Sequence, residues 1–470
     1  MITFILNNRL IKTDAPAGMS LLNYIRNEAG LKGTKSGCKE GDCGACTVLE
    51  GEIKDEKVSY RTIVSCLTPL GNVHGKHIVT IEGLNNNDLT PVQKEIIDNA
   101  GTQCGFCTPG FIISLTGYSL GNDAGAKPAA IASIAGNICR CTGYKSIEKA
   151  AINVAALLEN KDKNREIEWL SEHKFVPEYF KTIPQRLKSI DRAKPANAEP
   201  DLIIGGGTDL MVQKANIVKI SALDLKADKK ALKQIKQTGN SLVLGASATV
   251  NDLINNGTMK QHFPKLKQWF KLVSSEQIRN TATLAGNFVN ASPIGDMSIF
   301  FLALDAMLTL QNKSGKKRKV KLKDFFIDYK KTDLQRNEEI ITVEFNLPET
   351  DTSFNFEKVS KRLHLDIASV NSAITVKTDG NIIHKALLSA GGIGPVPSLL
   401  METSDFLTGK ELNTDTLLAA ETIIQKEISP ISDIRGSVQY KRLLIRQLFF
   451  AHFMEMFPEI IKPKPLLTAV

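Results

Sequence analysis

The sequence predicts an α+β protein of several domains, and three observations carry this prediction. The chain has 470 residues, which at about 100 to 200 residues per domain corresponds to roughly three or four domains. Short apolar runs typical of strands occur beside segments whose apolar residues recur at helical spacing. The eight cysteines fall into two groups of four, in different parts of the first third of the chain. We expect domains at residues 1–83, 88–160, 172–348 and 354–460.

The first two segments differ in their periodicity. In the first, short strands are expected to surround one helix that begins at Ser20, a favourable N-cap, and ends at Gly30. In the second, a proline opens each of three helices and a fourth helix follows. The expected strands are residues 3–6, 9–13, 63–66 and 78–81, and the expected helices begin at Pro91, Pro109, Pro128 and Lys145.

The rest of the chain continues this mixture of elements. Residues 201–348 alternate strands with helices, and later strands give way to helices at 414–426 and 437–456. Two polar stretches, 161–172 and 181–200, carry many charges and few large apolar side chains. We expect connections there, with a short helix in the second.

Charge and hydropathy narrow the classes of function. The net charge is +9, but the lysines are scattered, and the densest run, 313–323, flanks Ser314-Gly315 as a solvated hairpin would. No run approaches the roughly 18 apolar residues of a membrane span. The first ten residues lack the basic start and apolar core of a signal peptide. We expect a cytoplasmic protein with no membrane span and no nucleic-acid partner.

The first four cysteines have the spacing of a plant-type [2Fe-2S] site. Cys38, Cys43 and Cys46 read C-x4-C-x2-C, and Cys66 is the distant fourth ligand, which we expect to close the site from a strand. Glycines between them let a tight loop turn its backbone N–H groups toward sulfur. Zinc sites favour paired two-residue spacings, and disulfides are uncommon in cytoplasmic proteins. The sequence therefore predicts an iron-sulfur cluster here.

The other four cysteines are ambiguous by spacing alone. Cys104 and Cys107 form C-x2-C and Cys139 and Cys141 form C-x-C, which zinc fits as well as a cluster does. Cys107 and Cys141 each precede an expected helix, whose N-terminal dipole stabilises negatively charged thiolates. We expect a second [2Fe-2S] cluster, with structural zinc as the alternative.

Three short motifs in the third segment suggest dinucleotide binding. The first is a strand that ends in three glycines before a helix, where backbone N–H groups face a pyrophosphate. The second is a small-residue loop at 281–287, and the third is a helix start at 292–296. The G-x-G-x-x-G fingerprint is absent. Asp296 is a candidate acceptor for a ribose or adenine donor, and the alternative is a helix-start carboxylate favoured by the dipole alone.

Together these motifs resemble the molybdenum hydroxylases, a family that includes xanthine dehydrogenase, aldehyde oxidase and carbon monoxide dehydrogenase. The resemblance rests on GCKEGDCGAC, QCGFCTPG, CRCTGY and the glycine run IIGGGTDL, and covers about residues 3–457. It implies four folds in order: a β-grasp ferredoxin domain, a four-helix [2Fe-2S] domain, a vanillyl-alcohol-oxidase-type FAD domain and a C-terminal flavoprotein domain. It also implies that Gln103 donates to the pterin of a molybdenum cofactor close to the second cluster.

The resemblance assigns roles in flavin binding residue by residue. Asp296 would hold the adenosine side, Ile341 and Lys358 would approach the flavin, and Tyr329 would lie near the flavin face where nicotinamide stacks. A cation at Lys358 would stabilise reduced flavin, and the alternative is a surface lysine. The diphosphate would be held by Ile203, Ile204, Gly205, Gly206, Gly207, Thr208, Asp209 and Leu210, and by Thr283, Leu284, Ala285, Gly286 and Asn287.

The same resemblance implies half of an enzyme. The longer members continue for several hundred residues that bind molybdopterin, so we expect the catalytic molybdenum site on a large partner subunit and no catalytic residue here. The layout resembles the iron-sulfur and FAD subunit of bacterial xanthine dehydrogenase. It implies purine catabolism from hypoxanthine and xanthine to urate, with NAD+ as acceptor, in a heterotetramer of two small and two large subunits.

Three other functions stay open from the sequence. The partner's substrate is an aldehyde or another heterocycle in related enzymes. A flavin oxidase with structural zinc, and a chaperone for molybdoenzymes without turnover, fit the same motifs less fully. The acceptor, whether NAD+ or oxygen, and the cluster potentials do not follow from sequence.

Overall fold

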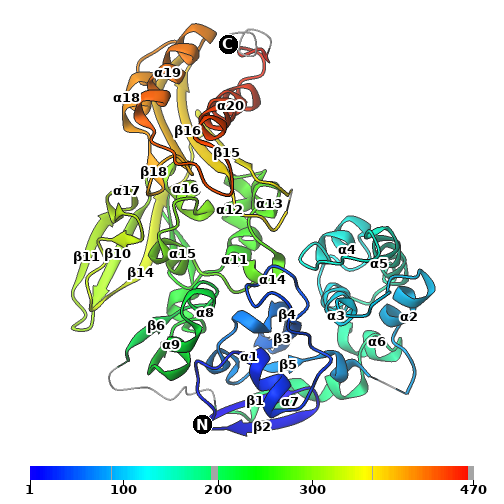
Figure 1. Cartoon of the computed structure of the whole chain (residues 1–470). Coiled ribbons are helices and arrows are strands. Elements are labelled where there is room, and N and C mark those ends of the chain that lie inside the picture. Colours follow the sequence, from blue (N-terminus) through cyan, green and yellow to red (C-terminus); the bar gives the residue numbers. More distant parts are fainter. Residues whose placement is uncertain (86, 192–199, 363, 464–470) are drawn as a thin grey trace. The chain divides into compact units, whose positions relative to one another are not determined.

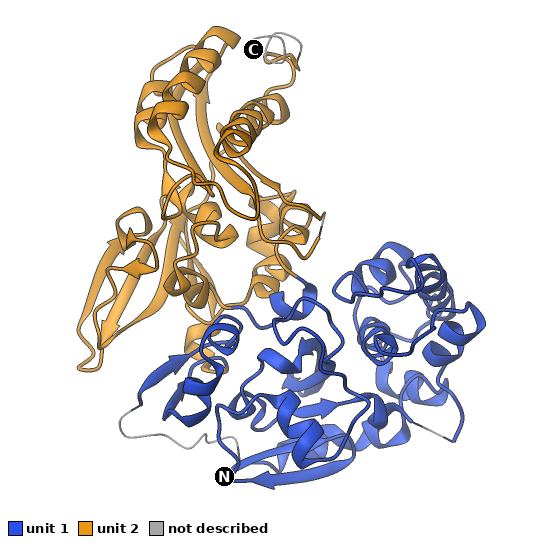
Figure 2. Cartoon of the chain, viewed as in Figure 1, with its two compact units in different colours: residues 1–227, 275–282 blue, residues 228–274, 283–470 orange. Residues whose placement is uncertain are grey.

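The computed structural model describes residues 1–85, 87–191, 200–362 and 364–463, which form two compact units (Figure 2). The first unit comprises residues 1–227 and 275–282, and the second comprises residues 228–274 and 283–470. The domain boundaries expected from the sequence stay predictions. Each unit is described by itself below.

A five-stranded β-grasp sheet opens the first unit. Its strand order is β2-β1-β5-β3-β4, with β1 parallel to β5 and the other pairs antiparallel. Ser20 caps the helix, as expected, and the helix is a short α turn continued by a π turn that ends at Glu28. Phe4, Ile25 and Ile78 meet in the core between sheet and helix. The elements are β1 (Ile2–Leu6), β2 (Arg9–Thr13), α1 (Leu21–Asn23), β3 (Thr47–Lys54), β4 (Lys57–Val64) and β5 (His77–Val79).

Four helices follow, as the sequence predicts. Thr90 and Gln93 form a capping box at the first, which fixes its start. The second is apolar nearly all round, so it is buried at the centre of the helical core. The helices are α2 (Pro91–Asp98), α3 (Thr108–Ser119), α4 (Lys127–Ser133) and α5 (Lys145–Leu157), shown in cyan tones in Figure 1.

The polar stretch at 161–172 is more than a connection, so that expectation was wrong. It contains the helix α6 (Glu166–Glu172), whose Leu170 is fully buried in the core of the four helices. Lys161 is buried as well, and its Nζ donates to the carbonyl oxygen of Ser119 at 2.9 Å and pairs with Glu166. Ile167 and Trp169 pack against the same core, so three apolar side chains and one buried cation hold a stretch whose composition reads as a linker. The short helix expected further on is α7 (Ile183–Lys188).

Small elements complete the first unit. Two short parallel strands, β6 and β7, carry the glycine run between them and the helices that follow it. Residues 275–282 add one turn of helix, α14, which packs against β4. The elements are β6 (Leu202–Ile204), α8 (Leu210–Gln213), α9 (Ala215–Ile220), β7 (Leu223–Leu225) and α14 (Glu276–Arg279).

The second unit contains two sheets with helices. The antiparallel sheet β11-β10-β14-β9-β8 includes the hairpin expected near Ser314-Gly315. Phe354 packs edge to face on both Phe263 and Phe300, whose own rings are tilted relative to each other. Its strands are β8 (Ile235–Thr238), β9 (Ser241–Gly245), β10 (Met307–Asn312), β11 (Lys317–Lys321) and β14 (Glu338–Asn346), and its helices include α11 (Val250–Asn255), α12 (Gly257–His262), α13 (Leu266–Lys271), α15 (Leu284–Asn290) and α16 (Asp296–Leu302).

The other sheet of this unit, β15-β16-β17-β18, carries the last three helices (Figure 1). Ser437 caps the final helix, close to where the sequence predicts its start. The elements are β15 (Thr352–Val359), β16 (Val370–Asp379), β17 (Ile382–Gly391), β18 (Ser398–Leu399), α18 (Met401–Leu407), α19 (Thr414–Glu427) and α20 (Val438–Met456). Across the described ranges, no helix is both long enough and apolar enough to span a bilayer.

A buried histidine fixes α20 on this sheet and makes stability depend on pH. His452 Nδ1 accepts from Asn355 Nδ2 at 3.0 Å, and its Nε2 lies 3.1 Å from Ser372 Oγ. Burial lowers the pKa of His452 to about 3. The unfolded chain therefore binds more protons below the ordinary histidine value of 6.5, and stability falls as pH falls from there toward 3.

We expect this histidine to contribute a slope of about 1.4 kcal/mol per pH unit between pH 6 and 4. The measurement is urea unfolding of wild type and His452→Gln at matched pH values. Burial raises the pKa of Glu357, which titrates in the opposite sense in both proteins and so cancels in the difference. Equal slopes for the two proteins would contradict the prediction.

Candidate redox cofactor sites

The loop of the first cysteine quartet directs backbone N–H groups at sulfur. Cys43 N and Glu40 N donate to Cys38 Sγ at 3.4 and 3.3 Å, and Cys38 N donates to Cys43 Sγ at 3.4 Å. A Cβ on Gly37 would lie 2.7 Å from Cys43 Sγ, so glycine is required there. N–H groups at this distance stabilise negative charge on thiolate ligands.

Cys66 lies in a short 3-10 turn, Ser65–Leu67, rather than in the strand that the sequence predicts. Strand β4 ends at Val64, because the next backbone N–H, that of Ser65, donates to the carbonyl oxygen of Cys46. The turn still delivers the fourth thiol. Cys46 and Cys66 are both buried.

The first quartet is arranged as two pairs of thiols. A hydrogen bond with Cys43 lowers the pKa of Cys38 to about 5, and the same bond raises the pKa of Cys43. Likewise, a hydrogen bond with Cys66 lowers the pKa of Cys46, and the pKa of Cys66 is raised. In a [2Fe-2S] cluster each iron takes two cysteines, so two pairs fit this group.

The second quartet is also two pairs. Burial and a hydrogen bond with Cys139 raise the pKa of Cys107 to about 12, and a hydrogen bond with Cys104 raises the pKa of Cys141. Burial opposes ionisation of Cys139, but hydrogen bonds from Thr142 outweigh it and lower its pKa. Cys107 is the N-cap residue of α3, as expected. Within the described ranges, no three Cys, His, Asp or Glu side chains converge on one ion position.

The first cysteine loop, which carries Cys38, Cys43 and Cys46, packs directly on the second cysteine loop, which carries Cys139 and Cys141. Ile138 N, next to Cys139, donates to the carbonyl oxygen of Cys43 at 3.0 Å. Asn137 Nδ2 donates to the carbonyl oxygen of Gly44 at 3.0 Å. One main-chain hydrogen bond thus joins a candidate ligand of the first cluster to the neighbour of a candidate ligand of the second.

The glycine run at 203–210 rests on the chain that follows Cys66. Asn72 Nδ2 donates to the carbonyl oxygen of Gly205 at 2.9 Å. A Cβ on Gly206 would lie 1.8 Å from the carbonyl oxygen of Thr281, and one on Gly207, whose φ is +88°, would lie 2.8 Å from Pro69 Cδ. Both positions therefore require glycine, which fits a loop whose main chain closely approaches a ligand.

Residues 283–287 of the second predicted flavin motif belong to the second unit, and residues 281–282 belong to the first. Thr283 caps α15, and its side chain accepts from Gly286 N at 3.2 Å. Ala285 N donates to the carbonyl oxygen of Ala246, whose own N–H donates to the carbonyl oxygen of Ile341. The structure thus brings Ile341 beside this loop through residue 246, which sequence reasoning missed. The small-residue run Gly245-Ala246-Ser247-Ala248 was its only signal.

Asp296 and Lys358, assigned to different parts of FAD, form one ion pair. Lys358 Nζ lies 2.7 Å from Asp296 Oδ2 and also donates to the carbonyl oxygen of Leu272 at 2.7 Å. Asn371 Nδ2 donates to Asp296 Oδ1 at 2.6 Å. The Lys358 side chain is 2 % exposed, so it is not a surface lysine. Asn371 was not expected, because nothing in the sequence marks a β16 residue as a partner of Asp296.

Removing this carboxylate should destabilise the second unit. Asp296→Asn leaves the buried Lys358 cation without its counter-charge, which typically costs about 3–5 kcal/mol. Urea unfolding followed by Trp269 fluorescence in a Trp169→Phe background measures this, because Trp269 packs on Phe354 in the same unit. The double variant Asp296→Asn with Lys358→Met should recover most of the loss. Wild-type stability of Asp296→Asn would contradict the role of the pair.

Two predicted residues lie on the surface. Tyr329 is 63 % exposed in the turn between β12 (Phe326–Asp328) and β13 (Lys331–Thr332). Lys330 ties that turn to α15, because its Nζ donates to the carbonyl oxygen of Asn290 at 2.8 Å. Gln103 is exposed immediately before Cys104. Their roles toward nicotinamide and pterin stay predictions.

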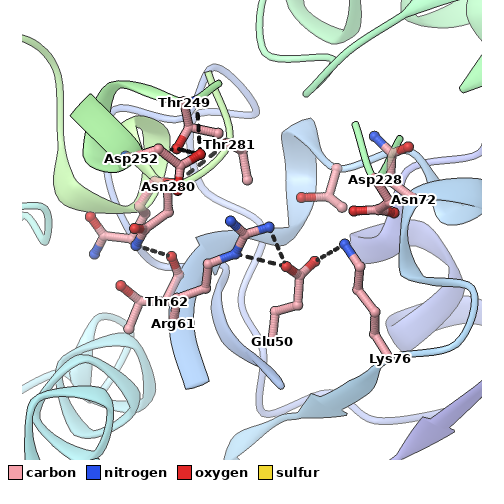
Figure 3. Close-up of polar contacts among 12 residues, drawn as sticks. Glu50, Arg61, Thr62, Asn72, Lys76, Asp228, Thr249, Asp252, Asn280 and Thr281 are labelled. Carbon is pink, nitrogen blue, oxygen red and sulfur yellow. Dashed lines mark hydrogen bonds and ion pairs between the residues drawn. The ribbon is translucent and has the colours of Figure 1, made fainter. Parts of the chain in front are cut away.

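A buried ionic network braces the β-grasp sheet, and sequence reasoning missed it (Figure 3). Glu50 on β3 pairs with Arg61 on β4 and, at 3.2 Å, with Lys76. Glu50 and Lys76 are almost fully buried. Next to Arg61, the carbonyl oxygen of Thr62 accepts from Asn280 Nδ2 at 2.9 Å, which attaches residues 275–282 to β4.

The fold and these sites define an iron-sulfur flavoprotein, and family models agree along the chain. A 2Fe-2S iron-sulfur cluster binding domain matches residues 4–70 and a [2Fe-2S] binding domain matches residues 80–152. An FAD binding domain in molybdopterin dehydrogenase matches residues 184–350. A CO dehydrogenase flavoprotein C-terminal domain matches residues 356–456. The chain therefore belongs to the molybdenum hydroxylase family, and its two [2Fe-2S] domains and FAD domain are those of that family.

Curated relatives include two kinds of molybdenum hydroxylase. Xanthine dehydrogenase of Blastobotrys adeninivorans is 28% identical over 98% of this chain and 41% of its own length. Xanthine dehydrogenase 1 of Arabidopsis thaliana is 29% identical over 95% of this chain and 39% of its own length. Aldehyde oxidase 1 of Bos taurus is 28% identical over 93% of this chain and 38% of its own length. The chain thus spans about two fifths of these relatives.

Solved structures share the fold. Carbon monoxide dehydrogenase from Hydrogenophaga pseudoflava aligns with a TM-score of 0.52 and 22% identity, over 55% of this chain and 89% of that chain. Quinoline 2-oxidoreductase from Pseudomonas putida 86 aligns with a TM-score of 0.50 and 24% identity, over 55% of this chain and 90% of that chain. At this identity the likeness concerns fold alone.

Proposed function

We propose that this chain is the electron-transfer part of a xanthine dehydrogenase, with two [2Fe-2S] clusters and FAD on this chain and the molybdenum site on a partner subunit. When bound, the clusters accept electrons singly and FAD pairs them for transfer to NAD+. By this proposal the Cys104 quartet would hold the cluster nearest the partner, and the Cys38 quartet would hold the cluster between it and FAD.

One observation supports this order of the cofactor sites. The segments around the first cysteine quartet contact both the second cysteine loop and the glycine run at 203–210. Cys43 accepts a hydrogen bond from Ile138 of the second cysteine loop. On the other side, the turn after Cys66 contacts the glycine run, where Gly207 approaches Pro69. A centre that contacts both others is the middle one. The exposed thiols of Cys104 and Cys141 support the second quartet as the one nearest the partner.

The residues proposed to hold each group are those of the sequence motifs, and the contacts above add how the cysteines pair. The eight cysteines would ligate iron, with Cys38 and Cys43 on one iron and Cys46 and Cys66 on the other. Residues 203–210 and 283–287 would hold the FAD diphosphate. Because Asp296 and Lys358 form one ion pair, we place them together at one part of FAD, with Asp296 orienting Lys358 rather than accepting from the ligand itself.

The partner and the acceptor belong to this proposal. The family models along this chain are those of iron-sulfur and flavin domains, and we propose that the molybdenum site lies on a separate large subunit. We propose a heterotetramer of two small and two large subunits that converts hypoxanthine and xanthine to urate in purine catabolism, in the cytoplasm.

The experiment is an assay of the copurified complex. Urate formation with NAD+ supports the proposal. Activity with an aldehyde but none with xanthine would show that the substrate is an aldehyde instead. The aldehyde oxidase match favours that second candidate. Metal analysis tests the cysteine assignment: about four irons per chain are expected, and stoichiometric zinc with a plain flavin spectrum would contradict it.

A further inference from the structure

A buried pair of side-chain amides lies where the two cysteine loops meet. Asn137 is two residues before Cys139, and Gln277 lies on α14 in residues 275–282 of the same unit. Both side chains are buried, at 3 % and 0 % exposure. Neither residue belongs to a ligand motif.

Asn137 joins the two loops with both ends of its amide. Its Nδ2 donates to the carbonyl oxygen of Gly44, which lies between Cys43 and Cys46. Its Oδ1 accepts from Ser114 Oγ of α3 at 2.7 Å and from Gln277 Nε2 at 3.3 Å. An amide has both a donor and an acceptor end, and a carboxylate of the same shape has only acceptors.

Gln277 completes the hydrogen-bond network around Asn137. Its Nε2 donates to Ser114 Oγ and Asn137 Oδ1, both at 3.3 Å. A Cβ on Gly136 would lie 1.9 Å from Gln277 Oε1, so the glutamine side chain fills the space over Gly136. The next residue, Ile278, contacts the same cysteine loop, because a Cβ on Gly41 would lie 3.0 Å from Ile278 Cδ1.

We propose that Asn137 and Gln277 are positioning residues that clamp the two cluster loops at a fixed distance and orientation. Gly44, Asn137 and Gln277 come from three distant parts of the sequence, and the loops carry their candidate ligands within two residues of the clamp. Three of the four amide ends of Asn137 and Gln277 are hydrogen-bonded, which restrains both side chains, and within the described residues Gln277 Oε1 has no hydrogen-bond partner. The inference rests on the proposed cysteine ligands and goes beyond them, because no ligand role requires these amides.

The test is the magnetic interaction between the two reduced clusters in the whole chain. Wild type is reduced with dithionite, and the spin–spin splitting between the clusters is measured by electron paramagnetic resonance. Asn137→Asp loses the donor to Gly44, and Gln277→Glu loses the donor to Asn137, at nearly unchanged shape. We expect each to lose or shift the splitting while both cluster signals and the iron content per chain stay as in wild type.

Two further variants frame the result. Asn153→Asp makes the same chemical change in the same helical domain, where Asn153 Nδ2 donates to Glu95 Oε2 at 2.9 Å, and its splitting should equal that of wild type. Gly136→Ala should displace Gln277 and reproduce the loss. If Asn137→Asp loses iron, its splitting cannot be compared with that of wild type. The variants Gln277→Glu and Gly136→Ala then test the clamp in its place.

The outcomes separate the two proposals. Wild-type splitting in Gln277→Glu and Gly136→Ala, at full iron content, would overturn the clamp and leave the cysteine assignment intact. A wild-type protein without two iron-sulfur signals would overturn the cysteine assignment and the clamp with it.

Discussion

Cys43→Ser should remove the first cluster and break the electron route at its middle. A serine hydroxyl is a poor ligand for iron at neutral pH, because the soft thiolate is the preferred donor. We expect iron to fall from about four to about two atoms per chain. Reduction of FAD by the partner's substrate should fall to background, because the first cysteine loop is the one that touches both neighbours. Dye reduction by NADH, which needs only FAD, should stay largely intact.

Cys107→Ser is the matched variant for the other quartet. It should also lose about two irons and block substrate electrons, and the spectrum of the remaining cluster should differ from that left in Cys43→Ser. Loss of NADH-dependent dye reduction in Cys43→Ser would contradict the proposed order, or would mean that the flavin loop depends on the cluster for its fold. Flavin content of the purified variant distinguishes these two explanations.

The sequence predicted most of what depends on local spacing. The quartet of Cys38 could be predicted because its first three ligands lie within nine residues. The caps at Ser20 and Ser437 could be predicted because capping involves only a few neighbouring residues. Leu170 shows the limit of that reading. A few apolar side chains, Leu170 with Ile167 and Trp169, hardly alter the composition of a charged stretch, yet they pack it as a helix on the core.

What the sequence did not predict depends on pairing between distant elements. Lys358 and Asp296 are 62 residues apart and meet only because β15 pairs with β16 and α16 packs on the same sheet. Asn371 joins them through the register that places it opposite Lys358. Gln277 reaches Asn137 across 140 residues. No short-range pattern encodes such contacts, so the assignment of separate roles to Asp296 and Lys358 could be made only by resemblance.

Gly206→Ala should cost the protein its flavin. A methyl group at this position would lie 1.8 Å from the carbonyl oxygen of Thr281, which is main chain and cannot rotate away. The loop must shift instead, and overpacking of this kind costs typically about 1–3 kcal/mol. Because FAD would bind the unshifted loop, affinity for FAD should weaken by about 5- to 150-fold. The ratio of flavin to protein after dialysis measures the loss.

Gly257→Ala provides the control in the same predicted domain. Gly257 opens α12, and a Cβ there would have no heavy atom within 4 Å, so flavin content should equal that of wild type. Iron content should be unchanged in both variants, because the cysteine loops do not include Gly206. Full flavin retention by Gly206→Ala would show that the glycine run does not carry FAD, since the loop has no room for a methyl group without moving. Loss of iron along with flavin would instead show that the turn after Cys66, on which the glycine run rests, transmits the shift to the first cluster.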